Sequence, residues 1–398
     1  MKVFFDTFGC RLNRAEALED EARFLSAGFD TAQSHSDADV IVIRACSITR
    51  RAQHDCEKLI SHVQKKYPAK RLIVQGCLPE TMLTSAAIKE SLLKNASESD
   101  TLPQRTARAY LKVKDGCNSK CTFCIVPSFR GKSKSVEFGK VLDKAKRFIE
   151  LGYEEIVLTG CNLSHYASND GNFASLLESL LSLPGKCRFR IGSLEPGSVA
   201  LAVAKLMAQS DALCKFLHLS IQSGSTSILS AMGRKYKPAD IEELVSFAAE
   251  NIHPLGLGAD VICGFPGESI LDFSQTKRLL SRYPFSNIHA FPYSERPGTV
   301  ASTLPGALPR DLRKKRALEL IDMGSTNKTK FAASMIGRTV DVIIEDEKEL
   351  SGWTGEYLFL KSEIANRLGA VRKKTIPFKV TKSDRGTLFG IPLAENGR

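Results

Sequence analysis

The chain has 398 residues, of which 43% are hydrophobic and 25% are charged, and its formal net charge at pH 7 is +12. A single hydrophobic core rarely grows beyond about 250 to 300 residues, so this length predicts two or three domains, and the composition excludes a largely disordered chain. The sequence shows neither a secretory signal pattern at its start nor an apolar run of about 18 residues, so we expect a cytoplasmic protein with no membrane partner.

The excess of positive charge lies in the middle of the chain. Residues 101–335 contain 31 Lys and Arg against 21 Asp and Glu, whereas the flanking segments are nearly balanced. A basic domain suits a polyanionic partner such as RNA, because cationic side chains displace counterions from phosphates. A basic enzyme that binds no nucleic acid would show the same balance, so charge alone leaves both interpretations open.

The first 100 residues alternate between apolar strand-like runs and amphipathic helical stretches. Strands are expected at 2–8, 40–46 and 71–77, and helices at about 14–27, 52–66 and 80–94. This order predicts a domain with a mostly parallel sheet. A cysteine stands at or just after the end of each strand, at Cys10, Cys46 and Cys77. Because the carboxyl ends of parallel strands share one edge of a sheet, we expect these three thiols to converge.

A polar stretch at 95–107 indicates a linker to a second domain. Six further strand signals follow, mostly separated by helical runs, at 110–113, 155–160, 188–193, 216–222, 258–265 and 287–292. This pattern predicts a full or partial parallel βα barrel, whose chemistry would lie at the carboxyl ends of the strands.

From about Gly337 the chain contains only short strand-like runs separated by turns, which predicts a small antiparallel β-barrel. Such barrels often bind nucleic acid, although this is an analogy of fold alone. Five basic side chains would form either a patch on it or an ordinary solvated surface: Lys361, Arg367, Arg372, Lys373 and Lys374. The chain is therefore expected to be α/β, with domains at 1–100, 101–335 and 336–398.

Residues 116–124, GCNSKCTFC, place Cys117, Cys121 and Cys124 just after the first strand of the predicted barrel. The chain has eleven cysteines, and an odd number in a reducing compartment favours metal ligation over a full disulfide framework. A structural zinc site would need a fourth ligand nearby, whereas a 4Fe-4S cluster held by three thiolates leaves one iron open for chemistry. Zinc or a purely structural cluster stays an alternative.

The C-x3-C-x2-C spacing, with Phe123 before the third cysteine, resembles the signature of the radical S-adenosylmethionine (SAM) superfamily. The resemblance implies that the open iron binds SAM, whose reductive cleavage yields a 5'-deoxyadenosyl radical. It also implies cofactor contacts in LTGCNLS, SLEPGS, SIQSGS and VICGFPGE. The predicted SAM contacts are Phe123, Gly160, Ser193, Glu195, Gln222, Ser223 and Gly264.

Cys10, Cys46 and Cys77 ahead of such a domain resemble the methylthiotransferase family across nearly the whole chain, in stretches such as TFGCRLNRAE, QGCLPE and FPYSERPGT. The resemblance implies that these cysteines bind a second 4Fe-4S cluster, which holds the sulfur to be inserted, and that the carboxy-terminal barrel is a TRAM-like domain. SAM would then serve twice, as methyl donor to that sulfur and as source of the radical. No catalytic residue beyond the two clusters is predicted.

The stretches SLEPGSV, MGRKY and FPYSERPGT are most similar to the branch that modifies threonylcarbamoyladenosine, at carbon 2, beside the tRNA anticodon. A basic pocket for its carboxylate could include Arg130, Arg190 and Arg296, unless these form structural ion pairs. The alternatives are isopentenyladenosine in tRNA, an aspartate of a small-subunit ribosomal protein, and a non-catalytic zinc or RNA-binding protein. The expected partners are the tRNA anticodon stem-loop and an electron donor such as flavodoxin or ferredoxin, with the chain acting as a monomer.

Other residues receive a structural interpretation. Arg44 and Ala45 precede the second cysteine, where the family usually has Asn-Thr. Cys161 lies beside the predicted cofactor edge and has no assigned role, and His218 and His289 lie in strand patterns typical of core or supporting residues. The remaining cysteines are expected to pack as small apolar side chains, namely Cys56, Cys187, Cys214 and Cys263.

Overall fold

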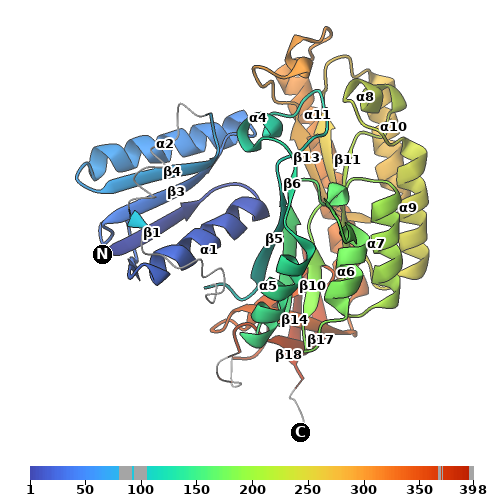
Figure 1. Cartoon of the computed structure of the whole chain (residues 1–398). Coiled ribbons are helices and arrows are strands. Elements are labelled where there is room, and N and C mark those ends of the chain that lie inside the picture. The colour runs from blue at the N-terminus through green and yellow to red at the C-terminus, as the bar shows by residue number, and fades with distance from the viewer. Residues whose placement is uncertain (80–91, 94–104, 366–368, 370, 394–398) are drawn as a thin grey trace.

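The computed structural model describes residues 1–79, 92–93, 105–365, 369 and 371–393. They form an amino-terminal α/β domain, an open barrel of strands and helices, and a small closed β-barrel below it (Figure 1). The predicted fold class is confirmed. The expected helix at 80–94 and linker at 95–107 lie largely outside the described residues, as does Arg367. No helix in the described ranges is both long and apolar enough to cross a membrane.

The amino-terminal domain contains the predicted parallel sheet. Its strands lie in the order β2-β1-β3-β4, and every pairing is parallel. Both helices begin two to three residues earlier than expected, with Cys10 and Thr49 at their N-cap positions. The elements are β1 (Lys2–Thr7), α1 (Arg11–Ser26), β2 (Asp30–Thr31), β3 (Val40–Cys46), α2 (Arg50–Lys66) and β4 (Arg71–Cys77).

The central domain contains the six expected strands as two parallel groups, β10-β7-β5 and β11-β12-β13. Two isolated parallel bridges, Phe189 to Leu213 and Leu194 to Leu219, join the groups. The strands are β5 (Ala109–Asp115), β6 (Lys134–Ser135), β7 (Glu155–Gly160), β8 (Ala167–Ser168), β9 (Gly171–Asn172), β10 (Arg188–Ile191), β11 (Phe216–Gln222), β12 (Gly256–Cys263) and β13 (Phe285–Pro292). The helices are α4 (Val126–Arg130), α5 (Phe138–Glu150), α6 (Phe173–Leu181), α7 (Ser198–Gln209), α8 (Thr226–Ala231), α9 (Pro238–Asn251), α10 (Ile270–Arg282) and α11 (Arg310–Ser334).

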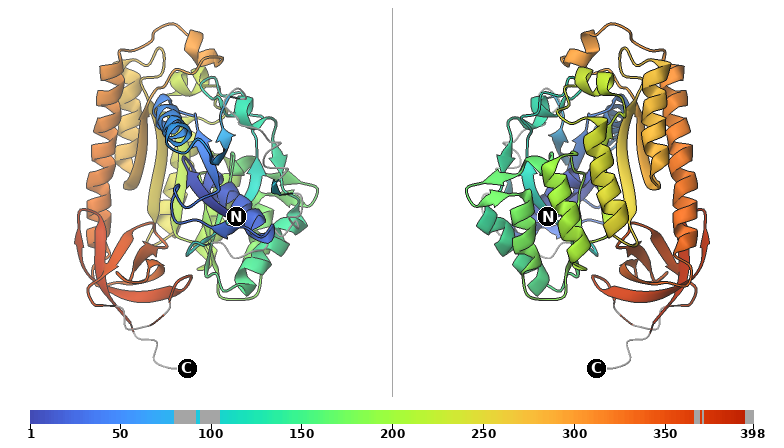
Figure 2. Two further views of the ribbon diagram at one scale, coloured as in Figure 1. Left: turned by 90° about the vertical axis from the view of Figure 1, so that its left-hand side faces the viewer. Right: turned by 90° about the vertical axis from the view of Figure 1, so that its right-hand side faces the viewer.

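The barrel is open between its first and last strands, because β5 and β13 do not pair with each other among the described residues. The amino-terminal domain lies across this opening, while helices cover the outside (Figure 2). Helix α1 contacts β5 and β7 through a small apolar cluster of Ala15, Leu18, Tyr110 and Val157. The inner faces of the barrel strands are thus partly covered by another domain.

Side chains alternate along the barrel strands between the helices and the interior. On β11, Leu217, Leu219 and Ile221 belong to the large hydrophobic core beneath the covering helices. Because successive side chains of a strand point to opposite faces, Phe216 and His218 point into the barrel interior. Polar residues on this inner face are therefore positioned to meet a ligand.

The carboxy-terminal barrel is closed in the order β14-β15-β16-β18-β17, as expected for a small barrel. Its strands are β14 (Thr339–Asp346), β15 (Ser351–Thr354), β16 (Phe359–Ser362), β17 (Thr375–Asp384) and β18 (Thr387–Pro392). Strand β15 was not predicted, and the pairing of β16 with β18 is parallel. The sequence pattern could not show that pairing, because it brings together strands that are separated by β17.

A buried ion-pair network attaches this barrel to the central domain. Glu155 is fully buried and pairs with Arg188 and Arg190 at 2.8 and 2.7 Å. Arg190 also donates to the backbone oxygens of Thr354 at 2.7 Å and Gly355 at 3.2 Å. Arg190 is 0% exposed, so of the two interpretations given for it, the structural ion pair is confirmed and the contribution to a substrate pocket is not.

Candidate active site

The cysteines of the amino-terminal domain, Cys10, Cys46 and Cys77, come together at the carboxyl edge of its sheet and are called the amino-terminal trio. Cys46 and Cys77 lie opposite each other in the β3–β4 ladder, and Cys10 caps α1. Gly9, with φ of +91°, brings the Cys10 loop close, since a Cβ at Gly9 would lie 3.1 Å from the Cys46 sulfur. Only a glycine allows this approach without strain.

The second set, Cys117, Cys121 and Cys124, is called the barrel trio and lies in the loop between β5 and α4. The Ser119 N–H donates to the Cys117 sulfur at 3.4 Å, and Arg234 donates to the Cys121 sulfur at 3.3 Å. The pocket that contains these thiols is lined further by four predicted cofactor contacts, Phe123, Ser193, Glu195 and Gln222. Residues from the ends of β10 and β11 are thereby brought to the barrel trio, which follows β5.

The other three predicted contacts lie differently. Gly160 adjoins the pocket and packs tightly on β5, since a Cβ there would lie 2.7 Å from the Lys114 carbonyl oxygen. Ser223 and Gly264 are not among the pocket-lining residues. The Ser223 hydroxyl shares a hydrogen bond with Thr276, and the Gly264 N–H donates to Glu268 at 2.7 Å. Both positions support the loops that follow β11 and β12.

Several pocket residues had no assigned role in the sequence, among them Asn162, Ser220 and Arg234. Asn162 has a left-handed backbone, with φ of 51°, and its Nδ2 donates to Glu195 at 2.7 Å. Its buried Oδ1 has no hydrogen-bond partner among the residues that the structure describes. This free acceptor fits a ligand with an N–H donor, such as the amino group of SAM. Asn162 lies in LTGCNLS and Arg234 lies in MGRKY. Both stretches resemble segments of the family, but the resemblance did not assign a role to either of these two side chains.

Arg130, the last residue of α4, connects the two trios, and its guanidinium uses all five of its N–H donors. Nε donates to the sulfur of Cys77 at 2.8 Å. Nη1 donates at 3.0 Å to both Glu16 and Asp115, the residue that ends β5 just before the barrel trio. Nη2 donates to Asn13 at 2.7 Å and to Glu16 at 3.1 Å. The two domains are therefore fixed to each other at the thiols.

The charges around Arg130 shift the acidity of its partners. Burial alone would raise the pKa of Glu16, but the hydrogen bonds from Arg130 and the charges of Arg44 and Lys112 lower it to about 2. Burial raises the pKa of Cys77 to about 11, against the opposing effect of Arg130. Burial likewise raises the pKa of Cys124 to about 11. These thiols keep their protons at neutral pH until a metal displaces them.

The thiols of each trio are too far apart to share a single zinc ion in this structure. Within the described residues, only one group of three or more His, Cys, Asp or Glu ligand atoms lies within 4.8 Å of one another, and it contains no cysteine. Sulfurs bound to one zinc ion at about 2.3 Å would be about 3.8 Å apart. Neither trio is so compact. The N–H donors that reach Cys77, Cys117 and Cys121 are the kind of partner that tunes a cluster.

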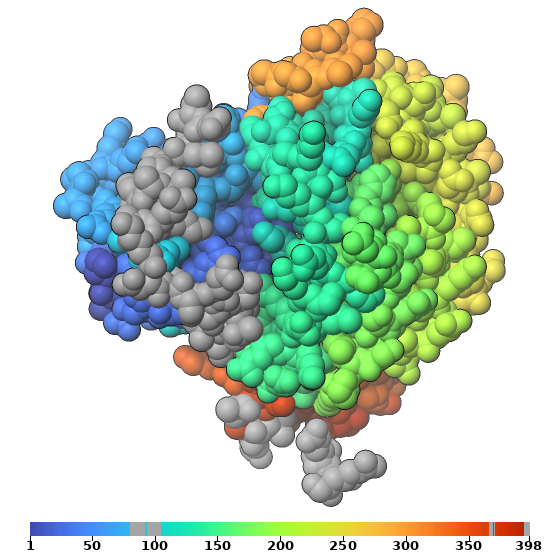
Figure 3. Space-filling model, viewed as in Figure 1, coloured from blue at the N-terminus to red at the C-terminus, as the bar shows by residue number. Residues whose placement is uncertain are grey.

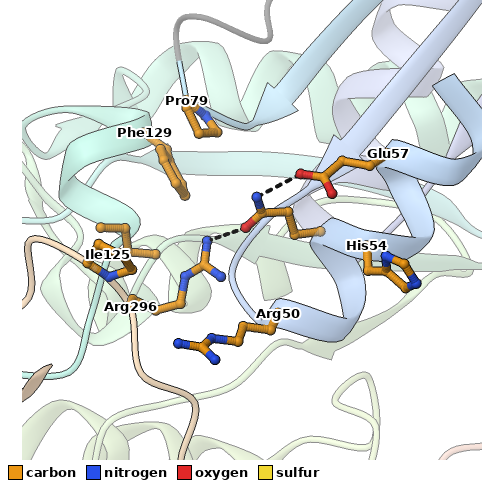
Figure 4. Close-up of a pocket in the computed structure, with 9 residues that line it drawn as sticks. Arg50, His54, Glu57, Pro79, Ile125, Phe129 and Arg296 are labelled. Carbon is orange, nitrogen blue, oxygen red and sulfur yellow. Dashed lines mark hydrogen bonds between the residues drawn. The ribbon is translucent and has the colours of Figure 1, made fainter. Parts of the chain in front are cut away.

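A cavity of about 480 Å³ lies between the amino-terminal domain and the barrel (Figure 4). Arg296 enters it and donates to Gln53 at 2.7 Å, while its buried Nε has no hydrogen-bond partner in the structure. Arg50 and His54 of α2 lie on the same wall, and Phe129 faces them from α4. The blue and teal surfaces of the two domains meet along this junction in Figure 3. The cavity thus offers positive charge beside the amino-terminal trio.

Two family models match the chain: the radical SAM superfamily over residues 111–280, and the uncharacterized protein family UPF0004 over residues 2–102. The chain is 31% identical to the threonylcarbamoyladenosine tRNA methylthiotransferase MtaB of Aquifex aeolicus, over 93% of this chain and 98% of that one. It is 30% identical to the tRNA-2-methylthio-N(6)-dimethylallyladenosine synthase of Chlorobium limicola, over 89% and 90% of the two chains.

Among solved structures, the radical SAM methyltransferase TsrM of Kitasatospora setae has a TM-score of 0.55 at 12% identity, and the match covers 76% of this chain and 77% of that one. At that identity the likeness concerns the fold alone.

The open barrel, with a three-cysteine loop after its first strand, is that of a radical SAM enzyme. Membership of that superfamily implies a 4Fe-4S cluster and SAM. The similarity to the relatives extends along almost the entire chain, so it narrows the class of protein from this superfamily to one family within it. The chain belongs to the tRNA methylthiotransferase family of radical SAM enzymes.

Proposed function

We propose that this protein inserts a methylthio group at carbon 2 of threonylcarbamoyladenosine beside the tRNA anticodon, using two 4Fe-4S clusters. The observation that carries the proposal is the pairing of two three-thiol sites across one domain junction, bridged by Arg130. A radical and a sulfur source must reach the same carbon, so two sites joined at one domain junction suit the geometric demand of the reaction.

Each trio has a distinct role in this proposal. The barrel trio would hold the cluster that binds SAM, with Phe123, Ser193, Glu195 and Gln222 around the cofactor, and it supplies the radical chemistry when loaded. The amino-terminal trio would hold the second cluster, with Arg130 donating a hydrogen bond to Cys77. Three thiols in each set leave one iron without a protein ligand, which is the position a substrate or sulfur species needs.

The choice of threonylcarbamoyladenosine rests on the relatives, several of which carry that name at 29 to 31% identity. The arginines of the junction cavity, Arg50 and Arg296, offer positive charge to the phosphates of the tRNA. A tRNA substrate further implies a cytoplasmic reaction, and the reductive cleavage of SAM requires an electron donor such as flavodoxin or ferredoxin.

Iron content tests the two clusters. After anaerobic reconstitution the wild-type chain should hold about eight iron atoms, and the variant with Cys10, Cys46 and Cys77 all changed to Ala should hold about four. A matched control variant changes Cys187, Cys214 and Cys263 to Ala. It removes the same number of thiols outside both trios and should keep about eight iron atoms. If the variant of the amino-terminal trio loses no iron, the two-cluster proposal is refuted.

Mass spectrometry of tRNA nucleosides from a deletion strain tests the substrate. The methylthio form of threonylcarbamoyladenosine should disappear and its unmethylthiolated precursor should accumulate. Loss of methylthio-isopentenyladenosine instead would favour the second candidate, which the 30% identical Chlorobium limicola relative supports. If both pools stay unchanged, the tRNA substrate is wrong.

A further inference from the structure

We propose that His218, Asp260 and His289 form a binding site for a divalent transition-metal ion in the barrel interior, and that the ion's open positions take the carboxylate of the substrate. The three residues come from the adjacent strands β11, β12 and β13, and their ligand atoms all lie within 4.8 Å of one another. The part of this proposal that concerns substrate binding by the ion rests on the function proposed above.

The ligand spacing suits one ion. His218 Nε2 lies 3.0 Å from Asp260 Oδ1, and His289 Nδ1 lies 3.3 Å from the same oxygen. Two donors bound to one metal at about 2.1 Å are roughly 3.0 to 3.4 Å apart, depending on the angle between them. Two imidazoles and one carboxylate form a mixed nitrogen and oxygen donor set, which suits Zn²⁺ or Fe²⁺.

The local backbone is arranged to bring these side chains together. Asp260 and His289 are register partners in the β12–β13 ladder, whereas His218 is the partner of Gly258, two residues before Asp260. The His218 ring lies across Gly258, because a Cβ at that glycine would be only 2.2 Å from His218 Nδ1. The glycine therefore gives His218 the space to lean diagonally toward Asp260.

The donor set itself favours a cation. Asp260 places a carboxylate oxygen between the imidazoles of His218 and His289. Neutral imidazole and carboxylate together form a donor set that binds divalent metal ions.

The site opens toward the cofactor pocket. The side chain of His218 is 7% exposed, that of Asp260 22% and that of His289 51%, so access is from the His289 side. Ser220, whose hydroxyl lies 3.5 Å from Asp260 Oδ2, also lines the pocket of the barrel trio. Three protein ligands leave coordination positions for oxygen donors, and a threonyl carboxylate beside the SAM site would be such a donor.

Metal retention by the reconstituted holoenzyme tests the site while both trios are filled with iron. The enzyme is incubated anaerobically with ZnCl2 and passed through a desalting column, and zinc and iron are counted per chain by mass spectrometry. Wild type should retain one zinc, and His289→Ala and Asp260→Asn should retain less than about a tenth of that with unchanged iron. The matched control His62→Ala removes an exposed histidine of α2 and should retain one zinc. Equal zinc in wild type and His289→Ala, or no zinc in wild type, would overturn the site.

Equilibrium dialysis tests the ligand, with free threonylcarbamoyladenosine as probe and adenosine as the matched nucleoside without a carboxylate. Zinc loading should tighten binding of threonylcarbamoyladenosine at least tenfold and leave adenosine unchanged, and His289→Ala should abolish the zinc effect. A zinc effect of equal size on both nucleosides would overturn the carboxylate contact. Because zinc counting needs no tRNA, failure of this site is distinguishable from failure of the proposed function.

Discussion

Replacement of Arg130 should loosen the junction between the amino-terminal domain and the barrel. Arg130→Met removes five hydrogen bonds, including those to Glu16 and to the Cys77 sulfur. Charge-assisted hydrogen bonds contribute about 1.5 to 3 kcal/mol each, but they do not add up when they share one group. Glu16 would keep its pairs with Arg44 and Lys112, so it would not become an isolated buried charge. We therefore expect a loss of about 3 kcal/mol at the junction.

Hydrogen-exchange mass spectrometry measures this loss where it occurs. A change of about 3 kcal/mol in the opening free energy corresponds to roughly 150-fold faster exchange. The faster exchange should be confined to peptides covering residues 11–16, 71–79 and 126–130, because these contain Arg130 and most of its partners. Strand β14 of the carboxy-terminal barrel should be unaffected. Arg130→Lys keeps the charge but has three donors on one nitrogen, so it should recover only part of the protection.

The control is Arg147→Met, which breaks a half-exposed pair with Glu150 on α5 and should change exchange by less than about 0.5 kcal/mol. If Arg130→Met exchanges like wild type, or if Arg130→Lys is fully protected, the five-donor geometry is not what holds the junction. Either result would refute the reasoning.

Three further predictions concern single residues. Glu155→Gln leaves the guanidinium groups of Arg188 and Arg190 without their buried carboxylate partner. The free energy of unfolding should fall by about 3 to 5 kcal/mol. Unfolding in guanidinium chloride, followed by the fluorescence of the single tryptophan, Trp353, measures this loss at the base of the barrel. The folded pKa of Glu16 is depressed to about 2 from its ordinary 4.5, so its contribution of at most about 3 kcal/mol is fully present above pH 4.5 and is lost as pH falls through 2. The difference in stability between cluster-free wild type and Glu16→Gln should therefore shrink steadily as the pH is lowered from about 5 to about 2. A constant difference would contradict the assignment. Gly258→Ala should push the His218 ring aside, and this crowding should lower the free energy of unfolding by about 1 to 3 kcal/mol. The variant should also retain less zinc. If its melting temperature and zinc content equal those of wild type, the ring has room for the added methyl group.

Local patterns in the sequence were sufficient to predict the architecture. Strand-like and helical runs alternate with distinct periods, so the parallel sheet, the six barrel strands and the small barrel were all expected, and the structure contains them. The barrel trio lies within nine consecutive residues, where spacing alone indicates a metal site. The resemblance to the radical SAM superfamily implied cofactor contacts at Phe123, Ser193, Glu195 and Gln222, and these four residues line the pocket of the barrel trio.

The sequence by itself determined which thiols and which strands this protein has, because both are written in short, regular patterns. Only the tertiary structure decided which side-chain contacts form between the domains. Arg130 reaches Cys77 and Arg190 reaches Thr354 through docking geometry that no periodicity encodes. His218 and His289 were expected to be core or supporting residues, yet strand register and the missing side chain of Gly258 place both against Asp260. Contacts between residues far apart in the chain depend on register and docking, and these exist only in the folded molecule.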